Sequence, residues 1–524
     1  MKIERTKNTA RNILSGTIMK IFQMLMPFAM RTMMIYCMGE KYLGLNSLFT
    51  SVLQVLNLAE LGISSAMVYS MYKPIAEDDA PTICALMKLY RTYYRIIGLV
   101  VGVLGLLLLP WIPKLVHDEL PPELNLYVLY LMNLAATVLS YWMFAYRNSL
   151  LTAHHRSDVL NIVLLFTQIG QYAMQAVILL WLKNYYLYVA AILVMQIANN
   201  LICAAISRRM YPDYAPRGRI KPDYHRDINA RIRDLFISRL GSVVLGSTDT
   251  IVISAFLGLS TLAIYQNYFF IISSIYGLME VILNAMLAGL GNSMVAESRE
   301  RNFHTMKRIN ILFIWLTFIC VCCFAGVFQP FMELWMGKER MLSYGMVFSF
   351  CTYFLVYEIV RLFNTFKNAA GEWHQDRFRP LISAVVNLCL NLFLVRTIGL
   401  YGIIWSSIVA LGCIEIPWLL HNVFTTVYKG ESLRAYGKQL LPYLLAGFFA
   451  WGLTAAVTAL PKLDAALMMP ISLVVSAGIP TGLFLLLFRH KADFQEGLAL
   501  LERMAGGRIP IRKWLHINAK GDAA

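Results

Sequence analysis

Long apolar runs recur along the whole chain and are separated by short polar stretches. Runs such as residues 96–113 and 471–488 contain few or no charges, and a helix of about 20 apolar residues crosses a hydrocarbon core about 30 Å thick. The pattern predicts about fourteen membrane-spanning helices, at residues 13–35, 43–70, 93–112, 124–146, 159–182, 186–206, 235–257, 262–294, 309–330, 344–366, 381–396, 403–424, 439–459 and 467–488. We therefore expect an all-α polytopic membrane protein.

Lysine and arginine are unevenly distributed among the connecting segments. With the N-terminus in the cytoplasm and the segments alternating, the cytoplasmic segments hold 34 Lys and Arg and the outer loops hold 7. Positive residues concentrate in cytoplasmic loops. Because the asymmetry holds in both halves, we expect an even number of spans with both termini cytoplasmic; fourteen spans is favoured and twelve is second.

Composition supports a membrane protein, since 58% of residues are hydrophobic and 15% are charged, against about one quarter charged in a soluble domain. The net charge of +16 follows from the topology. The largest cluster of positive residues lies at 208–233. Attraction to the anionic inner leaflet explains this cluster better than nucleic-acid binding does.

The amphipathic stretch at 494–504 predicts a segment lying on the inner leaflet. The nine cysteines indicate neither a disulfide framework nor a metal site.

The two halves of the chain are weakly similar. "RTMMIYCMGEKYLGLNSLF" from Arg31 aligns with "DTIVISAFLGLSTLAIYQNYF" from Asp249, which places Gly39 on Gly258. Six spans per half make the repeats parallel, and such transporters bind substrate between their repeats at membrane depth. We expect an N-terminal lobe (1–206), a basic cytoplasmic linker (207–234), a second six-helix lobe (235–424), two additional helices (439–488) and a basic cytoplasmic tail (489–524).

Ionisable residues inside predicted spans are the main candidates for function. They are Lys20, Arg31, Glu60, Arg239, Asp249, Glu280, Glu358, Arg361 and Glu415. Such residues are costly in lipid and face a cavity or a partner. Lys20 and Arg239 are close enough to cytoplasmic ends to reach the interface instead. Asp249 lies about fourteen residues into its span and is too short to reach the interface, so an ion pair and a cavity position both remain open.

Spacing suggests partners for some of these groups. Glu358 and Arg361 are three apart and can pair on one helix face, and a structural pair is favoured there. Glu415 precedes Pro417, which indicates a kink with a satisfied carboxyl. Glu60 and Glu280 either cap or pair with neighbouring helices. The amides of Gln168, Gln171, Gln175, Asn387 and Asn391 recur at three- and four-residue spacing; they either bond between helices or line a path for a hydroxyl-rich substrate.

The sequence contains no GxxxxGK[ST] phosphate loop, HExxH, paired CxxC or GxSxG motif. A pump driven by ATP would need the first of these, and a zinc protease the second. We therefore expect no P-loop ATPase and no zinc protease within this chain.

The predicted layout of six, six and two helices contains three informative stretches. They are Arg31 before "MGEKYLGLNSLF", "ELGISSAMV" and "STDTIVISAFLGLSTLAIYQ". Together these features resemble the polysaccharide flippases of the multidrug/oligosaccharidyl-lipid/polysaccharide exporter superfamily, through residue 488. The resemblance implies two six-helix lobes forming a V around a central cavity. It also implies transfer of an undecaprenyl-pyrophosphate-linked oligosaccharide from the inner to the outer leaflet by alternating access, for a cell-surface polysaccharide such as lipopolysaccharide or capsule.

The resemblance also implies roles for individual residues. Arg31, and more weakly Lys20 and Arg239, would attract the pyrophosphate. Asp249 is also carried over, by its position in the repeat. Positions inside the spans, and not the resemblance, add the other members of the polar or ion-coupling set: Glu60, Glu280, Glu358, Arg361, Gln168, Gln171, Gln175 and Asn391. No bound cofactor or metal is expected, and coupling to an H⁺ or Na⁺ gradient remains open.

Two other functions remain. A multidrug or cation antiporter of the same superfamily would use Asp249 or Glu60 as a proton or sodium site. An integral membrane glycosyltransferase or polymerase is the third. For the leading function we expect a monomer in the bacterial cytoplasmic membrane. Its partners would be lipid-linked oligosaccharide, membrane lipid, a polysaccharide polymerase and glycosyltransferases, without nucleic acid.

Overall fold

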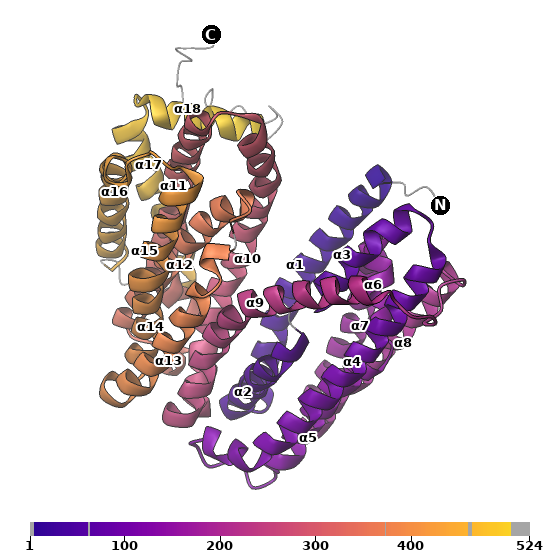
Figure 1. The fold of residues 1–524 in the computed structure, drawn as a ribbon. Coiled ribbons are helices and arrows are strands. Elements are labelled where there is room, and N and C mark those ends of the chain that lie inside the picture. Colours follow the sequence, from indigo (N-terminus) through magenta and orange to yellow (C-terminus); the bar gives the residue numbers. More distant parts are fainter. Residues whose placement is uncertain (1–4, 61–62, 373, 460–463, 505–524) are drawn as a thin grey trace. The chain divides into compact units, whose positions relative to one another are not determined.

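The computed structural model describes residues 5–60, 63–372, 374–459 and 464–504, and this part of the chain is all-helical, without strands (Figure 1). The α-helices are α1 (Arg5–Cys37), α2 (Glu40–Leu56), α3 (Ile63–Ala76), α4 (Ala80–Leu108), α5 (Leu126–Trp142), α6 (Tyr146–Ala153), α7 (Ser157–Val177), α8 (Tyr185–Met210), α9 (Pro222–Leu257), α10 (Leu259–Ala296), α11 (Arg299–Met336), α12 (Tyr344–Ala369), α13 (Arg379–Ile398), α14 (Leu400–Val409), α15 (Ile416–Asn422), α16 (Leu433–Ala459), α17 (Ala465–Phe488) and α18 (Ala492–Met504). Short 3₁₀ or π segments are η1 (Asn57–Glu60), η2 (Leu109–Leu115), η3 (Ile178–Leu182), η4 (Lys338–Arg340), η5 (His374–Asp376), η6 (Ala410–Glu415) and η7 (Val423–Val427).

Each predicted span overlaps one or more of these helices, which confirms a multi-pass, all-α membrane protein. Among the described residues, eleven helices are long and apolar enough to cross a membrane, or up to twelve if α5 and α6, bent by 52°, form one span. In the region of the second predicted span, α2 ends at Leu56. In that of the seventh, the described residues include the shorter apolar stretch Val243–Leu257 of α9. The count of fourteen remains a prediction.

The chain forms two compact units. Unit 1 contains Met1–Gln266 and Asn391–Leu400, and unit 2 contains Asn267–Leu390 and Tyr401–Ala524. The chain passes from unit 1 to unit 2 within α10, returns to unit 1 within α13, and enters unit 2 again at the start of α14. Helix α9 packs on α2 and α3 of unit 1. The lobe boundaries expected from the repeat remain a prediction.

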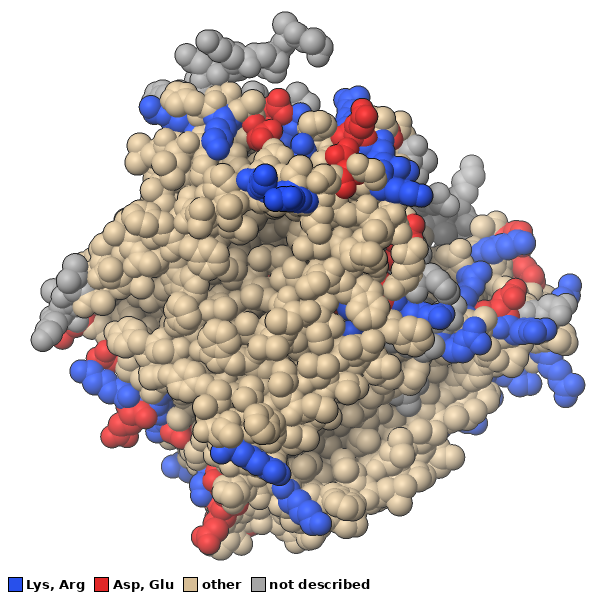
Figure 2. Space-filling view, turned by 60° about the vertical axis from the view of Figure 1, so that its left-hand side comes forward, with Lys and Arg blue, Asp and Glu red and all other residues tan. Residues whose placement is uncertain are grey.

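The outer surface of the helices is apolar. In Figure 2, uncharged side chains cover a broad area, and Lys, Arg, Asp and Glu gather near its edges. Large apolar side chains of several helices are strongly exposed, including Leu107, Trp181 and Phe393 at 66%, 79% and 67%. Contiguous apolar surface of this extent is unfavourable in water, and it suits contact with lipid.

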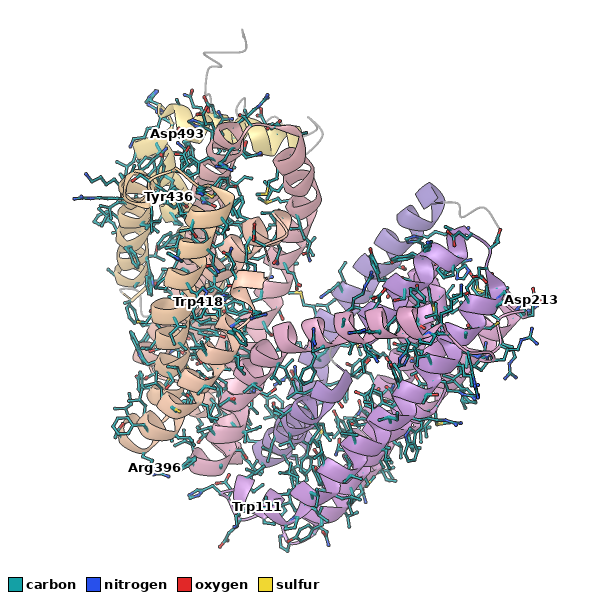
Figure 3. The ribbon with its side chains drawn as sticks, in the orientation of Figure 1. Trp111, Asp213, Arg396, Trp418, Tyr436 and Asp493 are labelled. Atoms are coloured by element: carbon teal, nitrogen blue, oxygen red, sulfur yellow. The ribbon has the colours of Figure 1, made fainter. Side chains whose placement is uncertain are left out.

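The amphipathic segment predicted at 494–504 forms α18, which packs on α11 of the same unit. Its apolar side chains Phe494 and Leu498 are completely buried. On its polar side, Glu496 pairs with Arg308, and Asp493 (Figure 3) accepts a hydrogen bond from Gln439 at 2.6 Å. Placement of this segment on the inner leaflet remains a prediction, and residues 505–524 of the tail lie outside the described residues.

The aligned glycines Gly39 and Gly258 occupy equivalent turns, between α1 and α2 and between α9 and α10. Both have positive φ, 106° and 89°, a backbone conformation that is strained in residues with a side chain. After the second turn, Asp118 accepts hydrogen bonds from the Leu259 and Ser260 backbone amides at 2.7 and 3.3 Å. The shared backbone geometry supports the alignment of the two halves.

A close helix approach in unit 1 depends on Gly44 of α2, where a Cβ atom would lie 2.2 Å from the Leu259 carbonyl oxygen. Because the obstacle is backbone, Gly44→Ala should separate the helices and destabilise the protein by about 1–3 kcal/mol. Thermal unfolding of the purified protein measures the effect. Gly102→Ala is the control, because its Cβ would make an ordinary 3.5 Å contact with Val138. Equal unfolding temperatures for the two variants would refute the close approach.

Candidate functional site

Arg361 on α12 forms the centre of a polar cluster in unit 2. Its Nη1 donates to Glu358 Oε1 and to the Tyr276 carbonyl oxygen of α10, both at 3.0 Å. Its Nη2 lies 4.0 Å from Glu280 Oε2. The predicted Glu358–Arg361 pair is therefore present, and it extends to a second carboxylate on a neighbouring helix.

The two carboxylates of this cluster differ in environment. The Glu358 side chain is 0% exposed, whereas that of Glu280 is 55% exposed and that of Arg361 is 16% exposed. Glu358 Oε2 is buried and accepts no hydrogen bond. One cation thus faces two carboxylates, and the more deeply buried of these has one oxygen without a donor.

Aromatic rings enclose the cluster. The Arg361 guanidinium carbon lies 5.8 Å from the ring centroids of both Tyr276 and Tyr357. Tyr276 also stacks on Phe354 at 5.1 Å between centroids. Ring faces attract a cation, and the apolar surroundings strengthen charge interactions relative to water. The rings hold Arg361 in place and exclude water from Glu358.

A second buried network in unit 2 joins the α12–α13 connection to η6. Arg379 donates to Asp376 through Nε at 2.7 Å and Nη2 at 2.8 Å, and its Nη1 donates to Glu415. Lys367 Nζ donates to Asp376 Oδ2 at 2.5 Å. The satisfied carboxyl predicted for Glu415 is present, with Arg379 as its partner. Two cations balance two carboxylates, so this network is neutral.

Asp249, in the last third of α9, accepts a hydrogen bond from Asn391 Nδ2 of α13 at 2.7 Å. The next residue, Thr250, accepts a hydrogen bond from Gln266 of α10 at 2.8 Å. Further along α13, the guanidinium carbon of Arg396 lies over the Phe256 ring of α9, 5.4 Å from its centroid. One polar stretch of α9 therefore binds two other helices of unit 1, and an amide contributes to the partners of Asp249.

Glu60, at the end of η1, is held by phenols of two other helices. Tyr94 of α4 donates to Oε1 at 2.7 Å, and Tyr141 of α5 donates to Oε2 at 3.0 Å. Tyr90 in turn donates to Tyr94 at 2.8 Å. Both carboxylate oxygens have donors, which is the pairing with neighbouring helices that the sequence left as one alternative.

The remaining candidates lie apart from these clusters. Arg31 of α1 is half-buried and interacts electrostatically with Tyr188 of α8. Gln175 is buried and donates to the Tyr188 carbonyl oxygen at 3.3 Å, while Gln168 and Gln171 are half-buried. Lys20 is exposed, and the side chain of Arg239 lies outside the described residues.

Sequence reasoning missed Lys367, Asp376, Arg379 and the tyrosines around Glu60. The three charged residues fall in the predicted cytoplasmic connection 367–380, where charges are ordinary. The spacing of three between Asp376 and Arg379 was an available signal. The link from Arg379 to Glu415 spans 36 residues and leaves no local pattern.

Many helices of the described chain could cross a membrane, and they enclose buried clusters of charged side chains. These features define a multi-pass membrane protein. Residues 9–290 match the model of the family described as polysaccharide biosynthesis protein. This match covers more than half of the chain, so the chain belongs to that family. The predicted resemblance is confirmed. No curated protein sequence matches the chain.

Solved structures of transporters share the fold. The lipid II flippase MurJ in an inward closed conformation is similar with a TM-score of 0.69 and 13% identity, covering 91% of this chain and 99% of that one. An inward-facing multidrug resistance MATE transporter of the MOP superfamily is similar with a TM-score of 0.56 and 13% identity. The similarity covers 80% of this chain and 99% of that one. The eukaryotic MATE transporter AtDTX14 is similar with a TM-score of 0.53 and 12% identity, covering 83% of this chain and 99% of that one.

Asp376 accepts hydrogen bonds from both cations of the neutral network. Asp376→Asn should therefore leave Lys367 and Arg379 with too little negative charge to balance their own. Removing one partner of a buried ion pair costs about 3–5 kcal/mol. Burial alone would raise the pKa of Asp376, but bonds from Arg379 and Lys367 outweigh it and hold the pKa below its ordinary value.

Because that pKa is lowered in the folded state, the stabilisation by Asp376 is present at neutral pH and is lost as pH falls through the lowered value. Thermal unfolding should therefore show a large deficit for Asp376→Asn at neutral pH that narrows in strong acid. Exposed Asp464 supplies the control variant, Asp464→Asn. A deficit no larger than the control's at neutral pH would contradict the network.

Asn391→Asp would place a second carboxylate against Asp249. Two carboxylates at this separation cannot both stay charged, so one must bind a proton. The variant should unfold at a lower temperature than the wild type at about pH 8, and the difference should shrink towards about pH 5. The control is Asn387→Asp, one turn earlier, because Asn387 bonds to the Ser407 hydroxyl, which can donate to a carboxylate. The same pH dependence in both variants would rule out the Asp249–Asn391 contact as its cause.

Proposed function

We propose that the protein is a flippase that moves undecaprenyl-pyrophosphate-linked oligosaccharide from the inner to the outer leaflet of the bacterial cytoplasmic membrane. Both termini are cytoplasmic in this proposal, and transport proceeds by alternating access around a central cavity. The observation that carries it is the family match over residues 9–290. A fold shared with a lipid II flippase over 91% of the chain supports it.

The substrate's pyrophosphate requires cations at membrane depth, because a charge is strongly disfavoured in hydrocarbon. Arg31 of α1 is half-buried and is our first candidate for this role. Lys20 and Arg239, nearer the cytoplasmic ends, would draw the headgroup in. Arg361 is not a candidate for this role, because the carboxylates of Glu358 and Glu280 already face it.

Sugar hydroxyls need hydrogen-bonding partners along the path. Gln168 and Gln171 of α7 are half-buried and can supply them. The prenyl tail can remain in the bilayer while the headgroup moves, because the surface of the helices is apolar. Glycosyltransferases and a polymerase would supply and consume the substrate.

A multidrug or cation antiporter is the second candidate function. The observation in its favour is the fold shared with MATE transporters at a TM-score of 0.56. Asp249 or Glu60 would then be the ion site. The two candidates separate in one comparison: loss of the protein should abolish surface polysaccharide if it is a flippase, and should raise drug sensitivity alone if it is an antiporter.

Arg31→Glu tests the proposed phosphate contact in a cell that depends on this protein for its surface polysaccharide. A negative side chain would repel the pyrophosphate, so we expect at least about a tenfold loss of polysaccharide, the effect of about 1.4 kcal/mol. Protein abundance in the membrane must be measured in parallel. Lys20→Glu, on the same helix at an exposed position, should cause a smaller loss.

Normal polysaccharide at normal abundance of Arg31→Glu would remove Arg31 from the site. It would leave the flippase function itself to be judged by deletion of the whole protein.

A further inference from the structure

Three glutamates lie inside the helix bundles with different sets of partners. Glu60 accepts a phenol hydrogen bond at each oxygen. Glu415 is bound by Arg379 in a network whose charges balance. Glu358 is bound at one oxygen by Arg361, and its other oxygen accepts no hydrogen bond. Glu358 therefore differs from the other two in being only half satisfied.

The space around Glu358 restricts what could satisfy it. The side chain is 0% exposed, and its Oε2 atom has almost no surface that a water molecule could touch. A water or a metal ion needs room and several further ligands. A proton needs no room, and it removes the charge whose burial is costly.

The charge of the cluster leads to the same conclusion. Arg361 is one cation facing two carboxylates, Glu358 and Glu280, which leaves one negative charge when all three are ionised. One bound proton makes the cluster neutral. The side chain of Glu280 is more than half exposed, whereas that of Glu358 is completely buried, and burial favours the neutral form of a carboxylic acid.

No neighbouring element supplies a second cation among the residues that the structure describes. Tyr276 and Glu280 face the cluster from α10, Cys320 from α11, and Tyr357 from α12 itself. Glu415 of η6 also acts on Tyr357, but its charge is held by Arg379. These groups are neutral or acidic, so they do not offset the excess negative charge.

We propose that Glu358 is a proton-binding site and that the proton is the ion coupled to transport, an inference that rests on the proposed flippase function. When Glu358 takes up a proton, its carboxylate becomes a neutral acid, and the ionic bond to Arg361 Nη1 is lost. Arg361 keeps its bond to the Tyr276 carbonyl oxygen and its charge pairs with Glu280. Protonation thus transfers Arg361 from a partner on its own helix to partners on α10.

Infrared spectroscopy of the purified full-length protein tests proton binding directly. The wild type, titrated between about pH 5 and about pH 9, should show the band of a buried carboxylic acid that Glu358→Gln removes. Glu415→Gln should retain it. Glu280→Gln leaves one cation facing one carboxylate, so in this variant the band should appear only at a lower pH than in the wild type. If Glu358→Gln does not fold, Glu358→Asp should shift the band in frequency. A band unaffected by substitution at 358, or no such band in the wild type, overturns the proposal.

The link to transport is tested in vesicles of phosphatidylethanolamine and phosphatidylglycerol that contain a fluorescent undecaprenyl-pyrophosphoryl oligosaccharide. Outward flipping by the wild type should be faster with an acidic outer side than without a gradient. Glu358→Gln should flip at one rate under both conditions, while Glu415→Gln should retain the dependence.

The outcomes separate the two proposals. Wild-type flipping that ignores the gradient, or a Glu358→Gln variant that still responds to it, overturns proton coupling at Glu358 and leaves the flippase standing. No flipping by the wild type under any gradient counts against the flippase function itself.

Discussion

A charge buried among apolar helices must be compensated where it lies, and this constraint organises the polar interior of the protein. Lipid offers no hydrogen bonds and little dielectric screening. Glu60 is compensated by two phenols, and Asp376 by Lys367 and Arg379. Each of these sets joins different helices or turns of one unit. The compensating bonds therefore also fix which helices pack together.

Compensation is incomplete at Glu358, and this difference from the other buried carboxylates is what points to a function for Glu358. The neutral network around Arg379 and the cluster around Arg361 lie in the same unit, and both pair an arginine with two carboxylates. In the first, charges balance and Asp376 is bonded at both oxygens. In the second, a carboxylate oxygen has no donor and the charges sum to a net negative value. A structural role explains the first network, but the second requires a ligand, and a proton fits the available space.

Much of the fold could be predicted from the sequence, because hydropathy depends on local composition and spans are long. Breaks within spans could not: the bend between α5 and α6 and the early end of α2 leave the composition apolar. Within the candidate site, spacing predicted the Glu358–Arg361 pair, since its partners are three residues apart. Asn391 as a partner of Asp249, and Arg379 as a partner of Glu415, are contacts between distant segments. No local spacing encodes them.

The central claim is that this member of the polysaccharide biosynthesis family transfers a lipid-linked oligosaccharide between leaflets. The most direct measurement is the fraction of a fluorescent undecaprenyl-pyrophosphoryl oligosaccharide that a membrane-impermeant quencher can reach, in vesicles with and without the purified protein. The account predicts that labelled lipid placed in the inner leaflet becomes accessible at the outer surface only when the protein is present. Equal accessibility in protein-containing and protein-free vesicles, with the protein folded and inserted, would contradict it.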